Sequence, residues 1–437
     1  MPYADLLDTG APKPSFREAL RFWLKLGCIS FGGPAGQIAI MQSELVDRRR
    51  WIGQPQFLRG LNFCTLLPGP EAQQLATYIG WRLHGLKGGI AAGGLFVLPG
   101  ALVLLALSWL AAAGRGTPAV AALFDGLKPI VIAIIAHAVW RIGRRALKGW
   151  EAVALAAAAF VAIYVLGVDF PWIVLAAGAI GWLAARTGSA VFVGGAHGGT
   201  EAAADPEAPA PPFWHRVALV ACVYLVLLIV PVGAVLLAFG TRPFLDIAQL
   251  FTKAAFVTFG GAYAVLPYVA DEAVHGYGWL SAGEMLDGLA LAETTPGPLI
   301  LVLQYVGFFA VWNAMPAGEG RLLAASIGAA LTTWVTFMPS FALVLLGAPY
   351  IERLHGDRSI GSALGAITAA VVGVILNLAV FLATAVFLPP GRGVDWIAIA
   401  AACAALAVLI RWNIAIHWLV LAGVVFGVLR ALATGAL

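Results

Sequence analysis

Residues Phe57 to Trp81 read FLRGLNFCTLLPGPEAQQLATYIGW, two apolar segments separated by Pro68-Gly69-Pro70. Proline has no amide hydrogen to donate and clashes with the preceding helical turn, whereas glycine readily adopts positive φ. A helix therefore ends at this tripeptide and a new helix begins after it. Each segment is about half as long as a helix that crosses a bilayer. The stretch predicts a broken helix at membrane depth.

A second break precedes the first in the chain. Phe16 to Phe31 is apolar and helical in pattern, Gly32-Gly33-Pro34 interrupts it, and Ala35 to Val46 resumes it. Two arrangements fit such segments: long discontinuous helices, or hairpins that enter and leave the membrane on one side. Irregular backbone at this depth is tolerated only where it is buried in protein or lines a watery cavity.

Both breaks recur in the second half of the chain, which indicates an internal repeat. The matching residues keep one offset: Lys25 falls on Lys253, Phe31-Gly32-Gly33 on Phe259-Gly260-Gly261, Glu44 on Glu272, Trp51 on Trp279, Gly60 on Gly288, and Pro68-Gly69-Pro70 on Pro296-Gly297-Pro298. Unrelated apolar sequences share Leu and Ala, not this pattern of Lys, Trp, Gly and Pro. We predict homologous halves at 1–187 and 213–437, joined by a flexible linker at 188–212 that is rich in small residues and proline.

The solvent of this chain is lipid. Of its 437 residues 61% are hydrophobic and 11% are charged, whereas soluble domains carry roughly 25% charged residues. Four stretches exceed the roughly 20 residues that span a bilayer: Gly88 to Ala113, Pro118 to Trp140, Trp214 to Phe239 and Leu322 to Leu346. With the shorter apolar stretches we expect about ten to thirteen membrane segments, all helical. The fold class is therefore an all-α integral membrane protein.

Charge predicts that the halves have inverted topology. Arg48-Arg49-Arg50, Arg82, Lys87 and the cluster Arg141–Lys148 share one side, which the positive-inside rule makes cytoplasmic, with the N-terminus and the linker. The arginine triplet is replaced in the second half by Gly276-Tyr277-Gly278 among acidic residues. Five predicted spans between the two motif sets would produce the inversion, and the charge rule favours hairpins over full crossings. Inverted repeats are a common plan of secondary transporters.

Composition and motifs exclude several other classes. The four cysteines lie in apolar segments without CxxC spacing, so neither a disulfide framework nor a metal site is indicated. No HExxH, Ser/His or Walker-type motif supports an enzyme or an ATP-driven pump, and no cofactor is expected. The net charge of +4 sits in loops, as membrane orientation requires, and does not indicate nucleic-acid binding.

The exposed amides of broken helices, at the positive ends of the helix dipoles, predict an anion site near the midplane. The candidate ligands for substrate are Lys25, Gly32, Gly33, Asn62, Gly69, Pro70, Gln73, Gln74, Lys253, Gly260, Gly261, Thr295 and Gly297. The lysines are candidates because charge inside a membrane segment is costly, although snorkelling to an interface explains them too. Glu71, beside the first Pro-Gly-Pro, and Glu293, before the second, are the candidates for proton coupling; capping the helix is the other role open to Glu71.

The strings FGGPAGQIAIM (Phe31 to Met41), LLPGPEAQQLATYIGW (Leu66 to Trp81), FVTFGGAYAVLPYV and ETTPGPL closely resemble the long, two-domain form of the chromate transporter family. The resemblance covers nearly the whole chain outside the linker. It implies chromate export from the bacterial cytoplasm through the inner membrane, with sulfate as the analogue and the proton gradient as the driving force. The second half departs from the first where Glu71-Ala72-Gln73-Gln74 becomes Leu299-Ile300-Leu301-Val302. We therefore expect the first half to contribute more to substrate contact.

Three questions stay open at this point. A passive anion channel and a carrier of sulfate or another oxyanion fit the same sequence. Direction, stoichiometry and the coupling ion are not encoded in a readable motif. The oligomeric state is open as well, with a homodimer among the arrangements allowed.

Overall fold

The computed structural model describes residues 13–31, 33–187, 192, 213–353, 358–389, 391, 393–412 and 414–435, and it is helical throughout, with no strand in those ranges. The linker prediction and Gly32 lie outside the described residues. The first half contains α1 (Phe16–Ile29), α2 (Gly33–Gln42), η1 (Ser43–Arg48), α3 (Gln54–Leu66), α4 (Glu71–Ala113), α5 (Pro118–Ala146), α6 (Trp150–Tyr164) and α7 (Phe170–Arg186).

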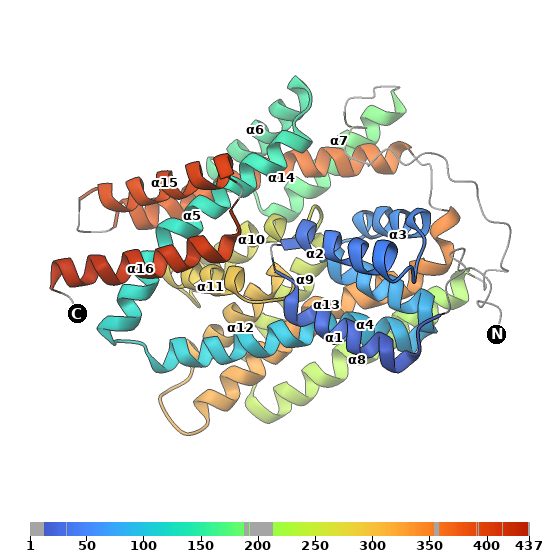
Figure 1. Cartoon of the computed structure of the whole chain (residues 1–437), viewed down its shortest axis with the longest axis horizontal. Helices are drawn as coiled ribbons and strands as arrows, with labels where there is room; N and C mark the ends of the chain where they lie inside the picture. Colours follow the sequence, from blue (N-terminus) through green and yellow to red (C-terminus); the bar gives the residue numbers. More distant parts are fainter. Residues whose placement is uncertain are drawn as a thin grey trace.

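The second half begins with α8 and then follows the order of the first (Figure 1). Its elements are α8 (Phe213–Phe239), α9 (Phe244–Val257), α10 (Ala262–Asp271), η3 (Glu272–Gly276), α11 (Ala282–Thr294), η4 (Leu299–Leu301), α12 (Val302–Ala314), α13 (Arg321–Gly347), η5 (Ala348–Arg353), α14 (Arg358–Phe387), α15 (Trp396–Trp412) and α16 (Ile416–Thr434). Within the described ranges, α4, α5, α8, α13, α14 and α16 are long and apolar enough to cross a bilayer. The chain is an all-helical, multi-pass integral membrane protein, as predicted.

Helix α4 is two helices joined by a sharp bend. His84 leaves the helical region at φ −138°, ψ 23°, and Gly85 has φ +62°, which a residue with a side chain rarely adopts. A Cβ at Gly80 would collide with Ala92 and with the carbonyl of Gly88, so the two parts pack back to back. We call residues 71–83 the short arm and residues 86–113 the long arm. The sequence predicted both parts, and the bend between them explains how a half-length helix precedes a full span.

The two first-half breaks lie in hairpins that open toward the bend. The carbonyl of Pro14, just before α1, accepts a hydrogen bond from His84 Nε2 at 2.9 Å, and Phe16 contacts the same ring. Arg49, just after η1, returns to within 3.7 Å of Glu18 near the start of α1. The pair of segments α1 and α2 therefore enters and leaves at one end of the molecule. The segments α1 and α2 therefore form a hairpin in the structure, and its re-entry on one side of the membrane stays a prediction.

The second-half hairpins open at the other end of the long arm. Arg115, which directly follows that arm, donates to Asn313 Oδ1 at 2.7 Å and pairs with Glu284. Asn313 in turn donates to the carbonyl of Trp279 at 2.8 Å. The entrance of α11, the exit of α12 and the turn after η3 thus meet beside Arg115. The hairpins of the two halves therefore open at opposite ends of the long arm.

The halves exchange their remaining helices. Helix α5 packs against α15 and α16 of the second half, while α14 packs against α6 and α7 of the first. Small residues permit this: Gly126 of α5 meets Gly423 and Gly427 backbone to backbone, and Gly181 of α7 meets Ser362 and Ala363 of α14. Close approach of small residues is the usual basis of helix association in lipid. Neither half forms its core alone.

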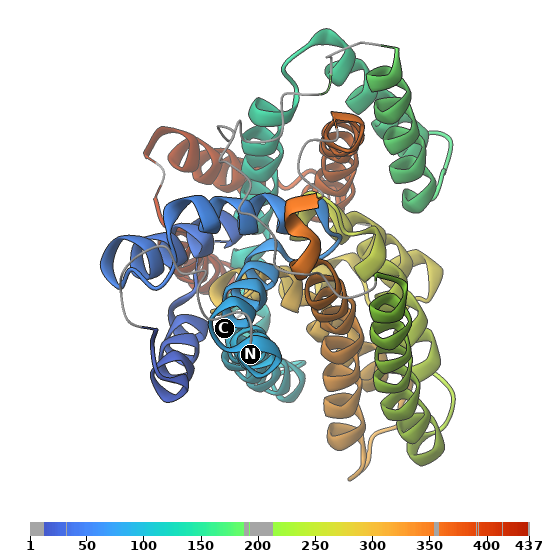
Figure 2. The same cartoon turned by 90° about the vertical axis from the view of Figure 1, so that its right-hand side faces the viewer.

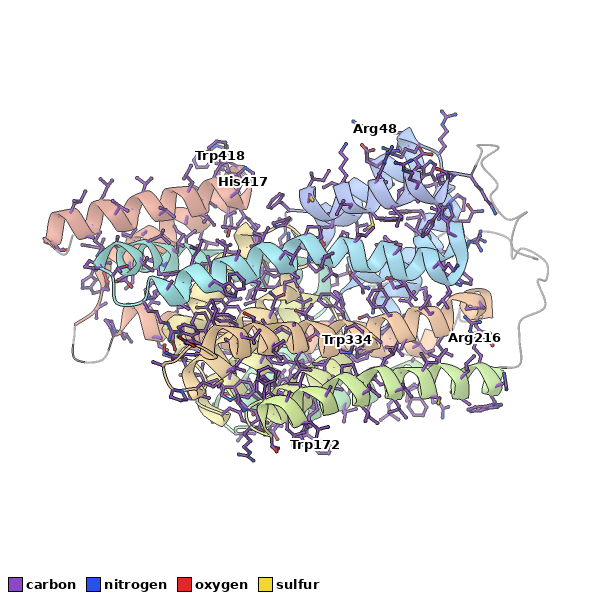
Figure 3. All side chains as sticks on the ribbon, turned by 90° about the horizontal axis from the view of Figure 1, so that it is seen from below. Arg48, Trp172, Arg216, Trp334, His417 and Trp418 are labelled. Atoms are coloured by element: carbon purple, nitrogen blue, oxygen red, sulfur yellow. The ribbon has the colours of Figure 1, made fainter. Side chains whose placement is uncertain are left out.

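Helix α8 is the outermost of the long helices. It lies beside α13 in both views (Figures 1 and 2). Trp334 Nε1 donates to the carbonyl of Leu227 at 2.8 Å, and Arg216 donates to the carbonyl of Leu345 at 2.5 Å, so α8 runs antiparallel to α13 (Figure 3). Its outer surface is apolar and exposed, as expected for a helix in contact with lipid.

Candidate functional site at the helix breaks

The two Pro-Gly-Pro loops meet the two Phe-Gly-Gly breaks of the opposite half. Gly69 donates its backbone N–H to the carbonyl of Thr258 at 2.7 Å, and Gly297 donates to the carbonyl of Ser30 at 2.8 Å. We call these contacts the Gly69 joint and the Gly297 joint. Both glycines have positive φ, +128° and +97°, a region in which a Cβ is strained. Glycine is therefore required at the centre of each loop.

The residues that accept these bonds are equivalent in the repeat. Ser30 and Thr258 each precede a break, are fully buried, and donate their hydroxyl one turn back, to Leu26 at 2.6 Å and to Ala254 at 2.5 Å. A two-fold axis produces reciprocal contacts, in which each loop meets the equivalent residue of the other half. The two joints are therefore reciprocal, since each loop bonds to the equivalent residue of the other half.

Gln37 distinguishes the Gly297 joint from its counterpart. Its Nε2 donates to the carbonyl of Gly297 at 2.7 Å and to that of Ser30 at 3.3 Å, and the side chain is buried. The repeat places Val265 at this position in the second half. The sequence analysis missed Gln37, although a glutamine within the apolar run 34–41 was the available signal, since polar groups inside a membrane need partners.

Gln73 and Gln74 lie in the first turn of the short arm, as predicted for the site, and are fully buried. Gln74 Nε2 donates to the carbonyl of Pro68 at 2.7 Å and so closes the first loop. Gln73 Nε2 lies 3.0 Å from the hydroxyl of Thr77. Glu71 directly follows Pro70, the residue that caps the short arm, and is partly buried. The first loop therefore carries three polar side chains at the start of a half-helix.

The second loop is polar only on its approach. Thr295 donates to the carbonyl of Ala292 at 3.0 Å, and Glu293 accepts a 2.5 Å hydrogen bond from the hydroxyl of Tyr263. After the loop come Leu299, Ile300 and Leu301, which are buried and apolar. Thr295 and Glu293 therefore lie on the approach to the second loop and Gly297 lies within it, with no counterpart of the glutamine pair after it.

The other predicted residues occupy two kinds of place. Gly33, Gly260 and Gly261 have φ of +72°, +80° and +94°, which explains why glycine forms the breaks. Lys25 and Lys253 are exposed, on the faces of α1 and α9 opposite the buried residues of those helices. Neither lysine lies in the buried cluster at the joints. Asn62 is partly buried on α3, one turn before the first loop.

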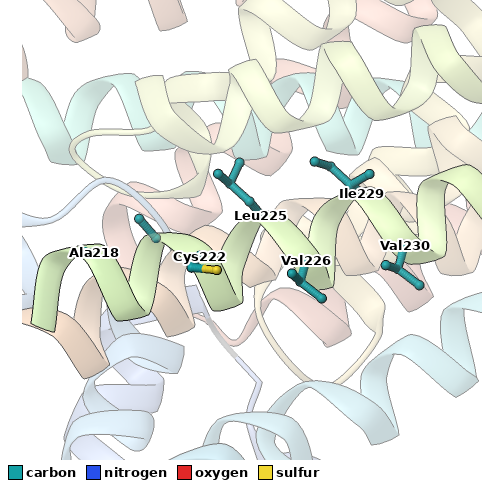
Figure 4. A pocket seen from close by; sticks show the side chains of 7 residues that line it. Ala218, Cys222, Leu225, Val226, Ile229 and Val230 are labelled. Carbon is teal, nitrogen blue, oxygen red and sulfur yellow. The ribbon is translucent and has the colours of Figure 1, made fainter. Parts of the chain in front are cut away.

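Metal-binding groups and surface grooves were the other candidate ligand sites. Across the described residues, no group of three or more His, Cys, Asp or Glu side chains is placed to bind a metal ion. A groove of ≈ 420 Å³ on the outer side of α8 is lined by Ala218, Ala221, Cys222, Leu225, Val226, Ile229 and Val230 (Figure 4). All of these residues come from one exposed apolar helix, so the groove is part of the lipid-facing surface and not of the site.

Comparison with known proteins fits this architecture. The model of the chromate transporter family matches residues 17–182 and 245–428, one match per half. The chromate transport protein of Pseudomonas aeruginosa is 35% identical over 380 residues, which cover 85% of this chain and 82% of the relative. The chromate transport protein of Cupriavidus metallidurans is 28% identical over 375 residues, covering 85% and 84%.

A shorter relative matches only part of the chain. The uncharacterized transporter YwrB of Bacillus subtilis is 27% identical over 135 residues, or 31% of this chain and 68% of the relative. No solved structure matches the chain. Because the family model covers most of both halves, the chain belongs to the chromate transporter family.

Proposed function

We propose that this chain is a secondary active transporter that exports chromate from the bacterial cytoplasm across the inner membrane, with sulfate as a structural analogue and protons as the coupling ion. The observation that carries the proposal is the pair of reciprocal joints, in which Gly69 bonds to Thr258 and Gly297 to Ser30. Each joint brings two helix breaks together, one from each half of a membrane protein. The names of the relatives supply the substrate: both are described as chromate transport proteins.

The proposed topology is an inverted repeat of re-entrant hairpins. The first-half hairpins open beside His84 and those of the second half beside Arg115, at opposite ends of the long arm. Arg48, Arg49 and Lys87 belong to the first end, which we assign to the cytoplasm by the positive-inside rule. Transporters built this way bind substrate at the interface between the repeats, near the midplane.

The chemistry available at that interface suits an oxyanion. The short arm begins at Glu71 and α10 begins at Ala262, so the positive ends of their dipoles point to the centre. Gly33, Pro70, Gly260 and Gly261 shape the backbone there, while Gln73, Gln74, Asn62 and Thr295 supply polar side chains. Gly69 and Gly297 already use their amides in the joints, so their part is to hold the loops in place.

The helices α10 and α2, which are equivalent in the repeat, differ in how far they are buried. This difference supports an alternating-access carrier rather than a fixed pore. Helix α10 is buried from Ala262 to Ala270, because α14 packs over it. Its counterpart α2 buries only Gln37 and Met41. A carrier in one state of its cycle is expected to cover one hairpin and leave the other open. If the second-half hairpin became uncovered and the first-half hairpin covered, the site would open to the other side of the membrane.

Glu71 and Glu293 are the proposed carriers of the coupled proton. A carboxylate beside an anion site repels the substrate unless it is protonated at one stage of the cycle. Glu71→Gln and Glu293→Gln should each abolish acceleration of flux by a pH gradient while leaving exchange of chromate against chromate intact. Full gradient-driven flux in both variants would contradict the assignment.

The direct test of the function is chromate uptake into proteoliposomes containing the full-length purified chain. A saturable flux that rises with a pH gradient and is inhibited by sulfate is the expected result. A flux that shows no saturation would favour the anion channel instead. A folded protein that carries sulfate but not chromate would move it to the sulfate carriers, and no flux of either anion would remove the proposed function.

A further inference from the structure

We propose that the oxyanion binds off the pseudo-two-fold axis, at the Gly69 joint, against the hydroxyls of Ser340 and Thr336, and that the Gly297 joint is a structural lock. The inference rests on the proposed function and adds a location and two residues of α13 to it. Neither hydroxyl was a candidate from sequence, since Ser and Thr are common within apolar helices. The case depends on comparing what surrounds the two joints.

The two joints have different neighbours at the same place. A Cβ at Gly69 would collide with Ser340 Oγ and would lie 2.7 Å from Gln74 Nε2. A Cβ at Gly297 would instead lie 3.2 Å from the methyl group of Leu301 and 3.5 Å from the Cα of Gly100. The two joints therefore share one backbone arrangement but differ in the side chains beside it. Polar side chains line it beside Gly69, and an apolar side chain and a bare backbone line it beside Gly297.

Two hydroxyls of α13 near the Gly69 joint have no hydrogen-bond partner among the described residues. Ser340 Oγ and Thr336 Oγ1 are buried, with residue exposures of 1%, and no described residue hydrogen-bonds to them. They lie one helical turn apart on the same face of α13. A buried polar group without a partner costs about 1–3 kcal/mol, and such groups are rare in native proteins. Two on one face indicate that something else binds there.

The unpartnered groups can meet an anion because hydroxyls rotate and donate. The buried amide of Gln73, whose Oε1 also lacks a partner, faces Thr77 Oγ1. Since a hydroxyl both donates and accepts, Gln73 can turn over without losing this bond and then present its N–H₂ group. Gln74 is fixed by its bond to Pro68 and positions the loop.

The Gly297 joint has fewer free hydrogen-bond donors for an anion than the Gly69 joint. Gln37 donates to the carbonyls of Gly297 and Ser30, so its Nε2 is fixed by two acceptors. The remaining atom, Gln37 Oε1, is unpartnered and only accepts hydrogen bonds, as is Gln74 Oε1 beside the Gly69 joint, so the two joints differ in their hydroxyls and not in their amide oxygens. Phe96 occupies on the long arm the position that Thr336 occupies on α13, one turn before the residue that meets the loop. Gln37 therefore ties the two halves together on one side, and substrate binds on the other.

The test is equilibrium binding of chromate to the purified full-length chain, with Ser340→Ala, Thr336→Val and their double variant. Matched controls are Ser108→Ala and Thr332→Val, because these buried hydroxyls already donate to Leu104 at 2.8 Å and Gly328 at 2.9 Å. We expect each site variant to raise the Kd about tenfold or more, since a hydrogen bond to a charged group contributes about 1.5–3 kcal/mol. The controls should keep the wild-type Kd.

Thermal unfolding separates binding from structure. Removing an unpartnered hydroxyl should leave the Tm unchanged or raise it, whereas each control loses a bond and should lower it. If the wild-type chain binds chromate and both site variants bind equally well, the placement is wrong and the hydroxyls face water only. A lowered Tm in the site variants without a change in Kd would also overturn it. If the wild-type chain binds neither chromate nor sulfate, the proposed function itself fails.

Discussion

Gly69 donates its backbone N–H to the carbonyl of Thr258 across the two halves, and its repeat partner Gly297 does the same to Ser30. The bond lengths, 2.7 and 2.8 Å, are nearly equal. Each joint pairs the loop of one half with the break of the other, so both joints hold the two halves together.

Alanine at Gly69 should be more damaging than alanine at Gly297. Both positions have positive φ, which costs about 1–3 kcal/mol for a residue with a Cβ. The Cβ at Gly69 also collides with Ser340, whereas that at Gly297 meets a mobile leucine methyl group at 3.2 Å. Thermal unfolding in detergent should rank wild type above Gly297→Ala above Gly69→Ala. Gly94→Ala, with nothing near its Cβ, is the control and should keep the wild-type Tm; equal Tm values for Gly69→Ala and Gly94→Ala would refute the strain argument.

Leucine at Gln37 should destabilise the protein by about 1–3 kcal/mol, because the carbonyl of Gly297 then stays buried without a partner. Chemical unfolding measures this loss. Gln42→Leu is the matched control, since that side chain is partly exposed and makes one 3.3 Å bond to Gln54. Its effect should stay below about 0.5 kcal/mol. Similar losses in the two variants would show that Gln37 is not a lock.

Arg115 should couple energetically to Glu284. The guanidinium pairs with this carboxylate, donates to Asn313 and lies 4.3 Å from the ring centroid of Phe309. A double-mutant cycle with Arg115→Ala and Glu284→Ala is expected to give a coupling of about 0.5–1 kcal/mol, as both side chains are partly exposed. The pair Lys128 and Asp125, 2.7 Å apart within α5, is a local comparison. Additive effects of the Arg115 and Glu284 changes would show that the pair does not join the halves.

Sided labelling of single cysteines tests the inverted topology. In a chain without Cys28, Cys64, Cys222 and Cys403, cysteines at Asp47 and Leu86 report on the first end and cysteines at Tyr277 and Glu319 on the second; all four positions are exposed. A membrane-impermeant thiol reagent should reach the first pair from the cytoplasmic side and the second pair from the outside. Reaction of both pairs from one side would exclude the inversion.

Acid should weaken the contact that closes the second half. Asp395 accepts from Arg430 at 2.6 Å and from the N–H of Ala398 at 3.0 Å. Burial alone would raise the pKa of Asp395, but the backbone N–H of Ala398 and the Arg430 guanidinium together hold the pKa below its ordinary value. A depressed pKa stabilises the fold above the unfolded value of about 3.9 and ceases to do so as the pH falls through the folded value. The partly exposed pair contributes less than about 1 kcal/mol.

Asp395→Asn measures that contribution. Its Tm should lie about 1 °C or less below that of the wild type from pH 5 to 7, and the difference should close as the pH falls below about 4. Asp47→Asn, at an exposed position outside the ion pairs of the described residues, should match the wild type throughout. A constant difference at every pH would show that the asparagine acts through packing and not through charge.

Much of the fold was predictable because the helix breaks consist of proline and glycine, which have strong backbone preferences. Proline and glycine at 68–70 and 296–298 end helices in any context, and lipid leaves helix as the only alternative between them. The charge of Arg48 to Arg50 also favoured a hairpin, and Arg49 does return to within 3.7 Å of Glu18. The exchange of α5 and α14 between halves was not predicted, since small residues at a helix contact do not name their partner.

The site was predicted in its loops and not in its surroundings. Gly69 and Gly297 each contact the break of the other half, and Gln73 and Gln74 are buried just after the first loop, while their part in binding stays a prediction. Lys25 and Lys253 were chosen for their equivalence, and their role as anion ligands stays a prediction for residues that are exposed. Ser340 could not be predicted from the sequence, because it lies beside Gly69, a residue far away in the chain. There is room for Ser340 there only because Gly69 has no side chain.

The measurement that tests the central claim most directly is chromate counterflow. Proteoliposomes loaded with unlabelled chromate are diluted into a trace of radiolabelled chromate without any ion gradient. A carrier whose site alternates between the two sides exchanges one anion for another, so label should accumulate transiently above its equilibrium level and then decline. Simple approach to equilibrium without an overshoot, from protein shown to be folded and to conduct chromate, would mean a channel and would contradict the account.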